Sequence, residues 1–486
     1  MHPADRWHLP ARGPYPRRPG NQVIPWIDGI PFYERLAAAI RGARARVWAI
    51  VSFLQPDFAF PDGTPWWALL GEAEARGVDV RVLFWRNPGF MSTAHVSLGD
   101  ARERARFATW GATWAGRWDS SGGDPAHCHH QKAYVVDALT DDPIAFVGGM
   151  VLSHATLARR GHHRGLEKHD AFVELRGPAV VDAEHNFVQR WNLGREDAEA
   201  PPWPDRRRAG PLPWPIRVPA RRGDVDVQLA RTLRPGLYDG AEVPAAPGAA
   251  PWAGGAGETT ILEHYRGAIA AATRTLYLEN QHPGQAALLE ALAAALDRGV
   301  EVVMVVPGVP MAAIGRARAE CEALARRGRA DEHRYGPTFR ALAALGERPG
   351  FTLVALARSD ADPAGGLTHR EIYCHAKVCV ADGEWLTIGS ANLVDLSLDA
   401  DHTELNAAAW GAATALPLLR SLCGEHCDQA LDEVDDLTAL RRLAESARRS
   451  RASLDAGGPL LAGCYAVDPA RYALDPPPTL GPTRRR

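Results

Sequence analysis

Two stretches of the sequence, "HHQKAYVVD" and "HAKVCVAD", carry the same three residues with chemical potential at the same spacing. Both read His, one residue, Lys, four residues, Asp, and the members are His130, Lys132, Asp137, His375, Lys377 and Asp382. A histidine can act as nucleophile or general acid near neutral pH, and lysine is a compact cation suited to phosphate oxygens. The chain has only three lysines, and two of them occupy these equivalent places. The pattern therefore predicts phosphoryl chemistry at two matched positions.

The residues around each motif indicate how a phosphate would be held. The four residues between Lys and Asp are strand-like, so His and Lys should project from the same face of a strand. An apolar strand then ends in small residues, "FVGGM" and "TIGSAN". Glycine there permits close backbone approach to a ligand, and an asparagine amide can donate to phosphate oxygens. We therefore predict substrate contacts from Gly149, Ser390 and Asn392.

Two such motifs brought face to face could cleave a phosphodiester. One histidine would attack phosphorus to give a phosphohistidine, the other would protonate the leaving alkoxide, and water or an alcohol would release the phosphoryl group. The lysine cations would stabilise the developing charge, so this chemistry requires no metal and no cofactor. A catalytic histidine needs a carboxylate on its other ring nitrogen. The candidates are Asp170 in "EKHDAFVEL" and Glu404 in "DHTEL", which follow their histidines, His130 and His375, by 40 and 29 residues. Asp137 and Asp382 are predicted to have a structural, ion-pairing role.

The elements that must position these motifs are themselves duplicated. "FYERLAAAIRGARARVWAIVSF" from residue 32 has the layout of "ILEHYRGAIAAATRTLYLENQ" from residue 261, an amphipathic helix followed by a strand. "LLGEAEARGVDVRVLFW" from residue 69 likewise matches "LLEALAAALDRGVEVVMVV" from residue 288. With the two motifs, three matched blocks follow one another in the same order. The sequence therefore predicts an α/β fold of two duplicated lobes, each a mixed β-sheet flanked by helices.

Composition divides the chain further and excludes some classes. The predicted parts are an irregular segment 1–23, a lobe 24–198, a Pro- and Arg-rich linker 199–223, a lobe 224–430, and a helical stretch with an irregular tail 431–486. A formal net charge of −3 over 486 residues argues against a dedicated nucleic-acid partner. We expect no transmembrane segment and no signal peptide, hence a cytoplasmic chain or one exported without a classical leader. The seven scattered cysteines indicate free thiols, and "CGEHC" (423–427) lacks a second ligand pair for zinc.

On these motifs the chain resembles the phospholipase D superfamily in its two-motif, single-chain form, over about residues 24–430. The resemblance also rests on "HDAFVELRGPAVVDAEHNFVQRWN", "VQLARTL" and "LYLENQ". It implies lobes related by a pseudo-twofold with the active site at their junction, His130 as nucleophile and His375 as acid, and Gln281 and Glu279 near the substrate. Two residues depart from the family pattern: Val151 stands where Asn or Asp is usual, and Leu396 where Arg usually precedes the serine.

The resemblance favours a lipid phosphodiesterase or phosphatidyltransferase that cleaves the head-group side of a phospholipid. Its partners would be the phospholipid at a membrane surface, reached peripherally by a monomer, and a water or alcohol acceptor. Two tryptophan-containing stretches, "PWW" (65–67) and the arginine-rich "WPDRRRAGPLPW" (203–214), are candidates for docking on lipid, with ordinary packing as the alternative. The same chemistry on nucleic acid or another non-lipid phosphodiester is the second hypothesis, and a non-catalytic scaffold is the third.

Overall fold

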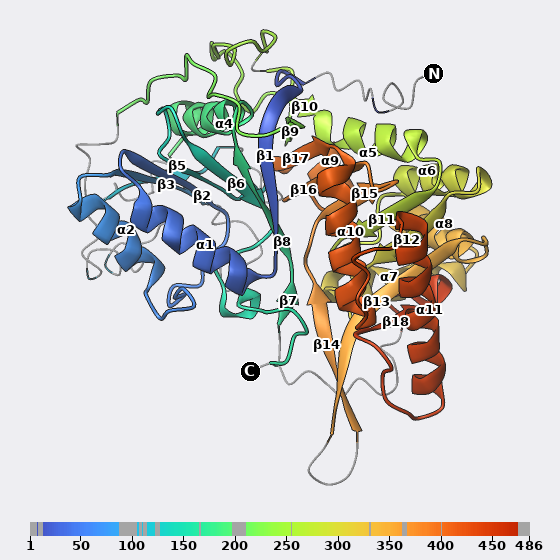
Figure 1. The fold of residues 1–486 in the computed structure, drawn as a ribbon. Helices are drawn as coiled ribbons and strands as arrows, with labels where there is room; N and C mark the ends of the chain where they lie inside the picture. The colour runs from blue at the N-terminus through green and yellow to red at the C-terminus, as the bar shows by residue number, and fades with distance from the viewer. Residues whose placement is uncertain are drawn as a thin grey trace.

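The two halves of the chain repeat one arrangement of strands and helices (Figure 1). The computed structural model describes residues 7, 13–86, 105, 109, 114–121, 127–164, 167–196, 210–253, 255–329, 332–361, 367–399 and 401–474. The first half holds β1 (Arg18–Ile27), α1 (Gly29–Gly42), β2 (Arg46–Val51), α2 (Trp66–Ala75), β3 (Asp79–Trp85), β4 (Ala115–Asp119), β5 (Ala133–Val136), β6 (Ile144–Gly148), η2 (His154–Thr156), β7 (Lys168–His169), β8 (Ala171–Arg176) and α4 (Val180–Leu193).

The second half holds a larger set of elements. They are β9 (Val225–Leu233), β10 (Glu258–Thr259), α5 (Thr260–Ala271), β11 (Thr275–Glu279), α6 (Ala286–Asp297), β12 (Glu301–Val305), α7 (Ala312–Ala325), α8 (Gly336–Gly346), β13 (Phe351–Ala361), β14 (Leu367–Cys374), β15 (Val378–Ala381), β16 (Trp385–Gly389), α9 (Asp395–Leu398), β17 (Glu404–Trp410), α10 (Ala412–Cys427), α11 (Asp436–Asp455), β18 (Cys464–Val467) and η5 (Pro469–Arg471).

The order of paired strands confirms the predicted duplication. The first half runs β4-β3-β2-β5-β6-β8-β1, in which β2–β3 and β3–β4 are parallel and the other pairs antiparallel. The second half runs β13-β12-β11-β15-β16-β17-β9 with the same directions at equivalent places. Each half is thus a mixed sheet with helices packed on it, which is the predicted fold class.

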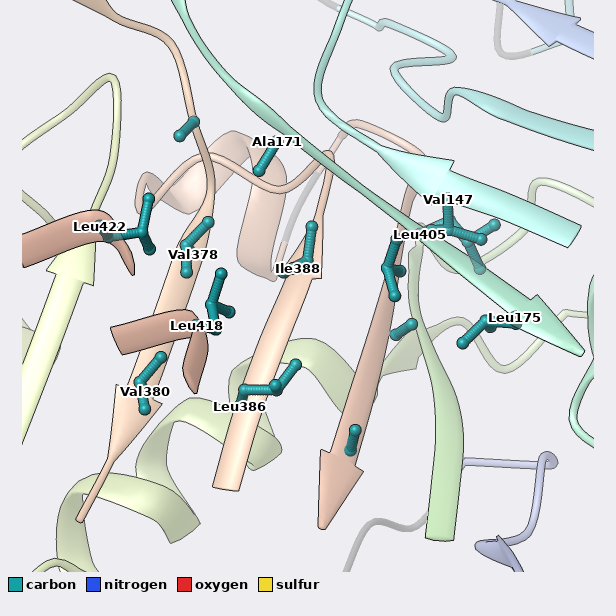
Figure 2. Packing of buried hydrophobic residues seen from close by; sticks show 14 of the residues in the cluster. Val147, Ala171, Leu175, Val378, Val380, Leu386, Ile388, Leu405, Leu418 and Leu422 are labelled. Atoms are coloured by element: carbon teal, nitrogen blue, oxygen red, sulfur yellow. The ribbon is translucent and has the colours of Figure 1, made fainter. Parts of the chain in front are cut away.

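Alternate side chains of the central strands pack into different hydrophobic clusters, one on each face of the sheet. In β2, Val47, Ala49 and Val51 join the cluster under α1 and α2, whereas Trp48 and Ile50 face the opposite way into a second cluster. Successive strand residues point to opposite faces, so a strand apolar throughout is one buried on both sides. The second cluster is shared between the halves: strands β6 and β8 contribute to it beside β15, β16, β17 and helix α10 (Figure 2).

Backbone pairing also joins the halves directly. The start of β1 is antiparallel to β9, although its remaining length pairs with β8, so one strand belongs to both sheets. Strand β7 pairs in parallel with the end of β14. In Figure 1, β1, β8 and β7 lie between the blue-to-green first half and the yellow-to-red second half.

Both chain ends are more ordered than the sequence indicated. The expectation of an irregular segment 1–23 is wrong from Arg18 onwards, because β1 begins there and Arg18 pairs with Val227. The expected irregular tail contains β18, which extends the second sheet along β13, with Cys464 and Tyr465 fully buried. The helical stretch after 431 is α11. The described part of the Pro- and Arg-rich segment, 210–223, has neither helix nor strand.

Candidate active site

The two motifs lie at equivalent places, immediately before β5 and β15. His130 and Lys132 precede the first residue of β5, and His375 and Lys377 lie between β14 and β15. They were predicted on the strands themselves, and the structure instead puts them on the segments that enter the strands. Each segment is held by the opposite half: His130 N donates to Thr403 O at 2.9 Å.

Each motif histidine is paired with a carboxylate from the other half of the chain. Nδ1 of His130 lies 3.0 Å from both oxygens of Glu404, and Nδ1 of His375 lies 2.6 Å from Oδ2 of Asp170. The backbone explains the crossing. The residue before each histidine is bridged to the residue before each carboxylate, His129 to Thr403 and Cys374 to His169. One twofold-related arrangement therefore brings together the four predicted catalytic His, Asp and Glu side chains.

Burial and charge set the protonation of this site. Burial lowers the pKa of His130 to about 4, against the opposing charge of Glu404. Burial alone would raise the pKa of Glu404, but His130 more than offsets it and holds that pKa below its ordinary value. Burial, followed by the charge of Lys377, lowers the pKa of His375, and burial raises the pKa of Asp170 to about 7. Both imidazoles are therefore neutral at pH 7, the form in which a ring nitrogen can attack phosphorus.

All three lysines of the chain contribute to this site. Lys132 Nζ donates to His130 O at 2.7 Å, and Lys377 Nζ donates to His375 O and, at 3.4 Å, to Gln281. Burial lowers the pKa of Lys132 to about 8 and that of Lys377 to about 7. Lys168 lies over the Tyr373 ring, 5.9 Å from its centroid. Its charge contributes to lowering the pKa of His375 and opposes the rise in the pKa of Asp170.

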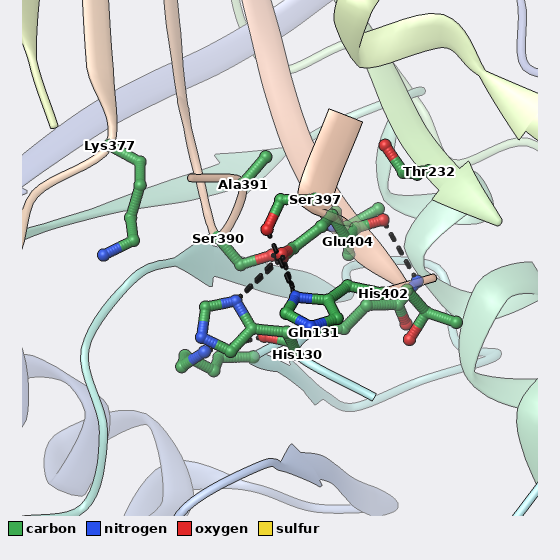
Figure 3. A network of polar contacts seen from close by, with 12 residues as sticks. His130, Gln131, Thr232, Lys377, Ser390, Ala391, Ser397, His402 and Glu404 are labelled. Atoms are coloured by element: carbon green, nitrogen blue, oxygen red, sulfur yellow. Dashed lines mark hydrogen bonds and ion pairs between the residues drawn. The ribbon is translucent and has the colours of Figure 1, made fainter. Parts of the chain in front are cut away.

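The residues predicted to bind substrate separate into two groups. Asn392 is 7% exposed and its Oδ1 makes no hydrogen bond within the described residues, and Gln281 touches Lys377, so both lie where a ligand could be bound. Ser390 is fully buried, and its hydroxyl donates to Glu404 Oε2 at 2.5 Å. Figure 3 shows Ser390 and His130 around Glu404. The contact of Ser390 is therefore with the catalytic carboxylate, which differs from the predicted contact with substrate.

Gly149 and Glu279 also lie behind the reacting groups. A Cβ on Gly149 would be 2.5 Å from Asp170 Oδ1, so glycine leaves the room in which this carboxylate reaches His375. Glu279 is fully buried and lies 3.2 Å from His169 Nε2 and 2.8 Å from His426 Nε2, away from any substrate. The predicted substrate contact of Glu279 is thus corrected to a buried polar network.

The motif aspartates, Asp137 and Asp382, have a structural role, as predicted, and both accept hydrogen bonds from backbone amides. Both have positive φ, 54° at Asp137 and 50° at Asp382. Asp137 Oδ1 accepts from the backbone amides of Arg44 and Ala45, each at 2.7 Å. Asp382 accepts in the same way from the amides of residues 273–275, including Thr275 at 2.7 Å. Hydrogen bonds to backbone amides tie the end of each motif strand to the start of its neighbour.

The sequence reasoning missed three residues at the site. The ring centroid of His402 is 6.0 Å from that of His130 (labelled in Figure 3), and its Nδ1 lies 3.3 Å from Ser397 Oγ. Burial lowers the pKa of His282 to about 3, with further lowering by the charges of Lys377 and His130. Lys168 is the third. The rarity of lysine in this chain could have drawn attention to Lys168. The position of His402, two residues before the predicted carboxylate Glu404, could have drawn attention to that histidine.

The predicted docking tryptophans are in part core residues. Trp66 is 3% exposed and packs with the helices of the first half, so its assignment to a lipid-docking surface is wrong. Trp67 is half-buried against the same cluster. Trp214 is half-buried, its ring 4.9 Å from that of His185, and Trp203 lies outside the described residues. Among the described helices, none combines the length and apolar character needed to cross a membrane.

Comparisons with known proteins agree with this geometry. A family model described as "Cardiolipin synthase, PLD-like domain" matches residues 265–420, which hold the second motif. The solved structure of phosphatidylserine synthase from Haemophilus influenzae Rd KW20 matches 99% of this chain and 96% of its own, with a TM-score of 0.57 and 10% identity, and so shares the fold. NucT from Helicobacter pylori matches 32% of this chain and 79% of its own at 14% identity, with a TM-score of 0.22 that is too low to support an argument. None of the curated proteins matches the chain.

The duplicated fold and the paired motifs define an enzyme that hydrolyses or transfers phosphodiesters. The match of residues 265–420 to a PLD-like domain is to the superfamily that the two motifs predicted.

Proposed function

We propose that the chain is a phospholipase D-type phosphodiesterase or phosphatidyltransferase, which cleaves the head-group side of a phospholipid through a phosphohistidine. The observation that supports it most is the crossed pairing, in which each motif histidine is oriented by a carboxylate from the other half. The protein would work as a monomer at a membrane surface, without a metal in the reaction and without a nucleic-acid partner.

The roles of the two histidines depend on which ring nitrogen carries the proton in each. Glu404 is ionised and accepts the Nδ1 proton of His130, so the lone pair of His130 Nε2 is free to attack phosphorus. As the Nε2–P bond forms and the P–O bond to the head group breaks, Nε2–H of His375 gives its proton to the leaving alkoxide. Burial raises the pKa of Asp170 to about 7, so this carboxyl can carry the proton that faces Nδ1 of His375, and the neutral ring then has its own proton on Nε2. As Nε2 gives up that proton, Nδ1 takes the proton of Asp170, which is left ionised.

The second step reverses the proton transfer. His375 takes a proton from water or from an alcohol, whose oxygen attacks the phosphoryl group as the P–N bond to His130 breaks. Lys132 and Lys377 hold the non-bridging oxygens through both steps, and a buried site strengthens their electrostatic effect. Asn392, which follows the second motif strand, can complete the set, because its side-chain NH2 can donate to a phosphate oxygen.

The test uses phosphatidylcholine vesicles with the purified protein and an alcohol, either ethanol or serine. Serine is included because the neighbouring fold belongs to a phosphatidylserine synthase. We expect phosphatidic acid, and with each alcohol the matching phosphatidyl ester, from the wild type and from a His333→Asn control remote from the site. His130→Asn and His375→Asn should form neither product. Cleavage of bis-p-nitrophenyl phosphate with intact lipid would refute the lipid substrate and retain the two-histidine chemistry.

A trapping experiment separates the two histidine roles. His375→Asn retains the proposed nucleophile and, with bis-p-nitrophenyl phosphate, whose leaving group needs no proton, should accumulate an acid-labile phosphoryl adduct on His130. The adduct is detected by mass spectrometry after digestion at alkaline pH. The adduct on His375 in a His130→Asn variant would reverse the assignment.

A further inference from the structure

A second cluster of buried ionisable residues connects the two halves beside the active site. Asp28, His162, His169 and Glu425 each offer one ligand atom, and these four atoms lie within 4.8 Å of one another. The most exposed of the four side chains, Glu425, has 4% of its surface accessible. Asp28 lies between β1 and α1, His162 follows η2, His169 is in β7, and Glu425 is in α10. Three ligands therefore come from the first half and one from the second.

The separations within the cluster fit a small metal ion. His162 Nε2 lies 3.1 Å from Asp28 Oδ2 and 3.5 Å from Glu425 Oε1, and His169 Nδ1 lies 3.0 Å from Asp28 Oδ1. Four N and O ligands about 2.0 Å from a tetrahedral zinc ion are about 3.3 Å from one another. The observed distances lie on both sides of that value.

The facing atoms contact one another as close histidine–carboxylate pairs, but their hydrogen-bond geometry is poor. Neither ring nitrogen of His162 makes a well-formed hydrogen bond within the described part of the chain, and the same holds for His169 Nδ1 and Asp28 Oδ2. Buried polar side-chain atoms in proteins are in the large majority paired. An ion at the centre would give all of these atoms one shared partner in place of these poorly formed contacts.

The outer contacts are those of metal-bound histidines. His169 directs Nδ1 into the cluster, and its Nε2 lies 3.2 Å from Glu279 Oε2. His162 directs Nε2 into the cluster, and its Nδ1 lies 3.8 Å from Glu167 Oε2. A carboxylate on the far nitrogen fixes the tautomer and orientation of a ligating histidine. Two neutral imidazoles and two carboxylates would also balance the charge of a divalent ion.

We infer that Asp28, His162, His169 and Glu425 bind one divalent metal ion of the zinc type, which clips α10 of the second half to β1 and β7 of the first. Its role is structural, because the proposed phosphoryl transfer uses none of the four residues. His169 is followed directly by Asp170, so the ion would also steady the carboxylate that orients His375. The site is distinct from Cys423 and Cys427 of "CGEHC", which are buried free thiols outside the cluster.

The test measures metal in the full-length protein, purified without a histidine tag. We expect about one zinc ion per chain by mass spectrometry of the metals, and a melting temperature that falls with EDTA and recovers with ZnCl2. Zinc K-edge absorption should give only N and O neighbours, near about 2.0 Å. His162→Gln and Glu425→Gln should each lose the ion, whereas His163→Gln, at the exposed neighbouring position, should retain it.

Several results would overturn the inference. Protein without zinc, whose melting temperature neither ZnCl2 nor EDTA changes, would leave the cluster as imidazolium–carboxylate pairs. Zinc retained equally by both ligand variants would place it elsewhere, and a sulfur neighbour at about 2.3 Å would assign it to the cysteines. If one variant fails to fold, the wild-type metal content and the other variant still decide. None of these readouts depends on lipid cleavage, so failure of the proposed function leaves this test intact.

Discussion

Replacing Glu404 by glutamine should disable His130 while leaving the fold intact. Ser390 Oγ donates to Glu404 Oε2 at 2.5 Å, and the Leu405 amide donates to the same hydroxyl at 3.0 Å, so the serine proton points to the carboxylate. In Glu404→Gln the side-chain oxygen must accept from Ser390, which turns the amide NH2 towards His130 Nδ1. The ring would then accept at Nδ1 and carry its proton at Nε2, the nitrogen that must attack phosphorus.

The size of the effect follows from this wrong tautomer and the lost negative charge. A triad carboxylate replaced by its amide lowers kcat by about 10⁴-fold in the best-studied case. Here His130 is partly held by its backbone bond to Thr403, so we expect a loss of about 10² to 10⁴-fold, or about 3 to 5 kcal/mol in the activation free energy. KM should change little, because Glu404 is fully buried behind the histidine.

The assay is product formation from phosphatidylcholine vesicles, with bis-p-nitrophenyl phosphate as a second substrate. Glu184→Gln is the matched control, because this buried carboxylate accepts from the Leu139 amide and touches neither motif histidine. The double variant Glu404→Gln/Ser390→Ala should recover part of the activity. Without the serine hydroxyl, the glutamine side chain can turn its oxygen towards His130 Nδ1 and so restore the reactive tautomer. A Glu404→Gln protein within about threefold of wild-type kcat, or a double variant slower than the single one, would refute the tautomer argument.

Three further predictions test the site and its burial. Gly149→Ala places a Cβ 2.5 Å from Asp170 Oδ1 and should lower kcat by about 10²-fold; Gly71→Ala, which meets open space in a helix, should leave kcat unchanged, and equal kcat in both would contradict the prediction. Burial lowers the pKa of Lys377 to about 7 and that of Lys132 to about 8, and the cations are the active forms, so kcat/KM should fall in two steps above about pH 7. Lys377→Arg should remove the first step, and a profile flat to pH 10 would exclude this role. His264 has its pKa lowered by burial to about 4 from 6.5, so the folded protein binds fewer protons and stability is lost as pH falls from 6.5 towards 4, by about 2 kcal/mol at pH 5. Denaturant unfolding of His264→Gln at pH 7 and 5 should show a smaller loss than the wild type, and an unchanged loss would contradict the cause.

Local patterns of the sequence predicted the fold class well, because both halves satisfy the same periodicities. Strand and helix positions followed from apolar spacing, and the matched motifs followed from the rarity of lysine. The predictions were weaker where distant contacts decide. Trp66 has the composition of a surface anchor but packs in the core, and Cys464 and Tyr465 lie in a polar tail yet pair at a sheet edge that only the folded second half provides. Ser390 looked like a phosphate contact until the fold placed Glu404 beside it.

The sequence by itself predicted phosphoryl chemistry from two histidines, two lysines and two later carboxylates at matched places. It paired the carboxylates wrongly, because Asp170 follows His130 along the chain and Glu404 follows His375. The tertiary structure crosses them. Each motif segment pairs with a strand of the other half, and this puts Glu404 on His130 and Asp170 on His375. Partners more than 200 residues apart are set by the packing of two sheets, and no local pattern encodes that contact.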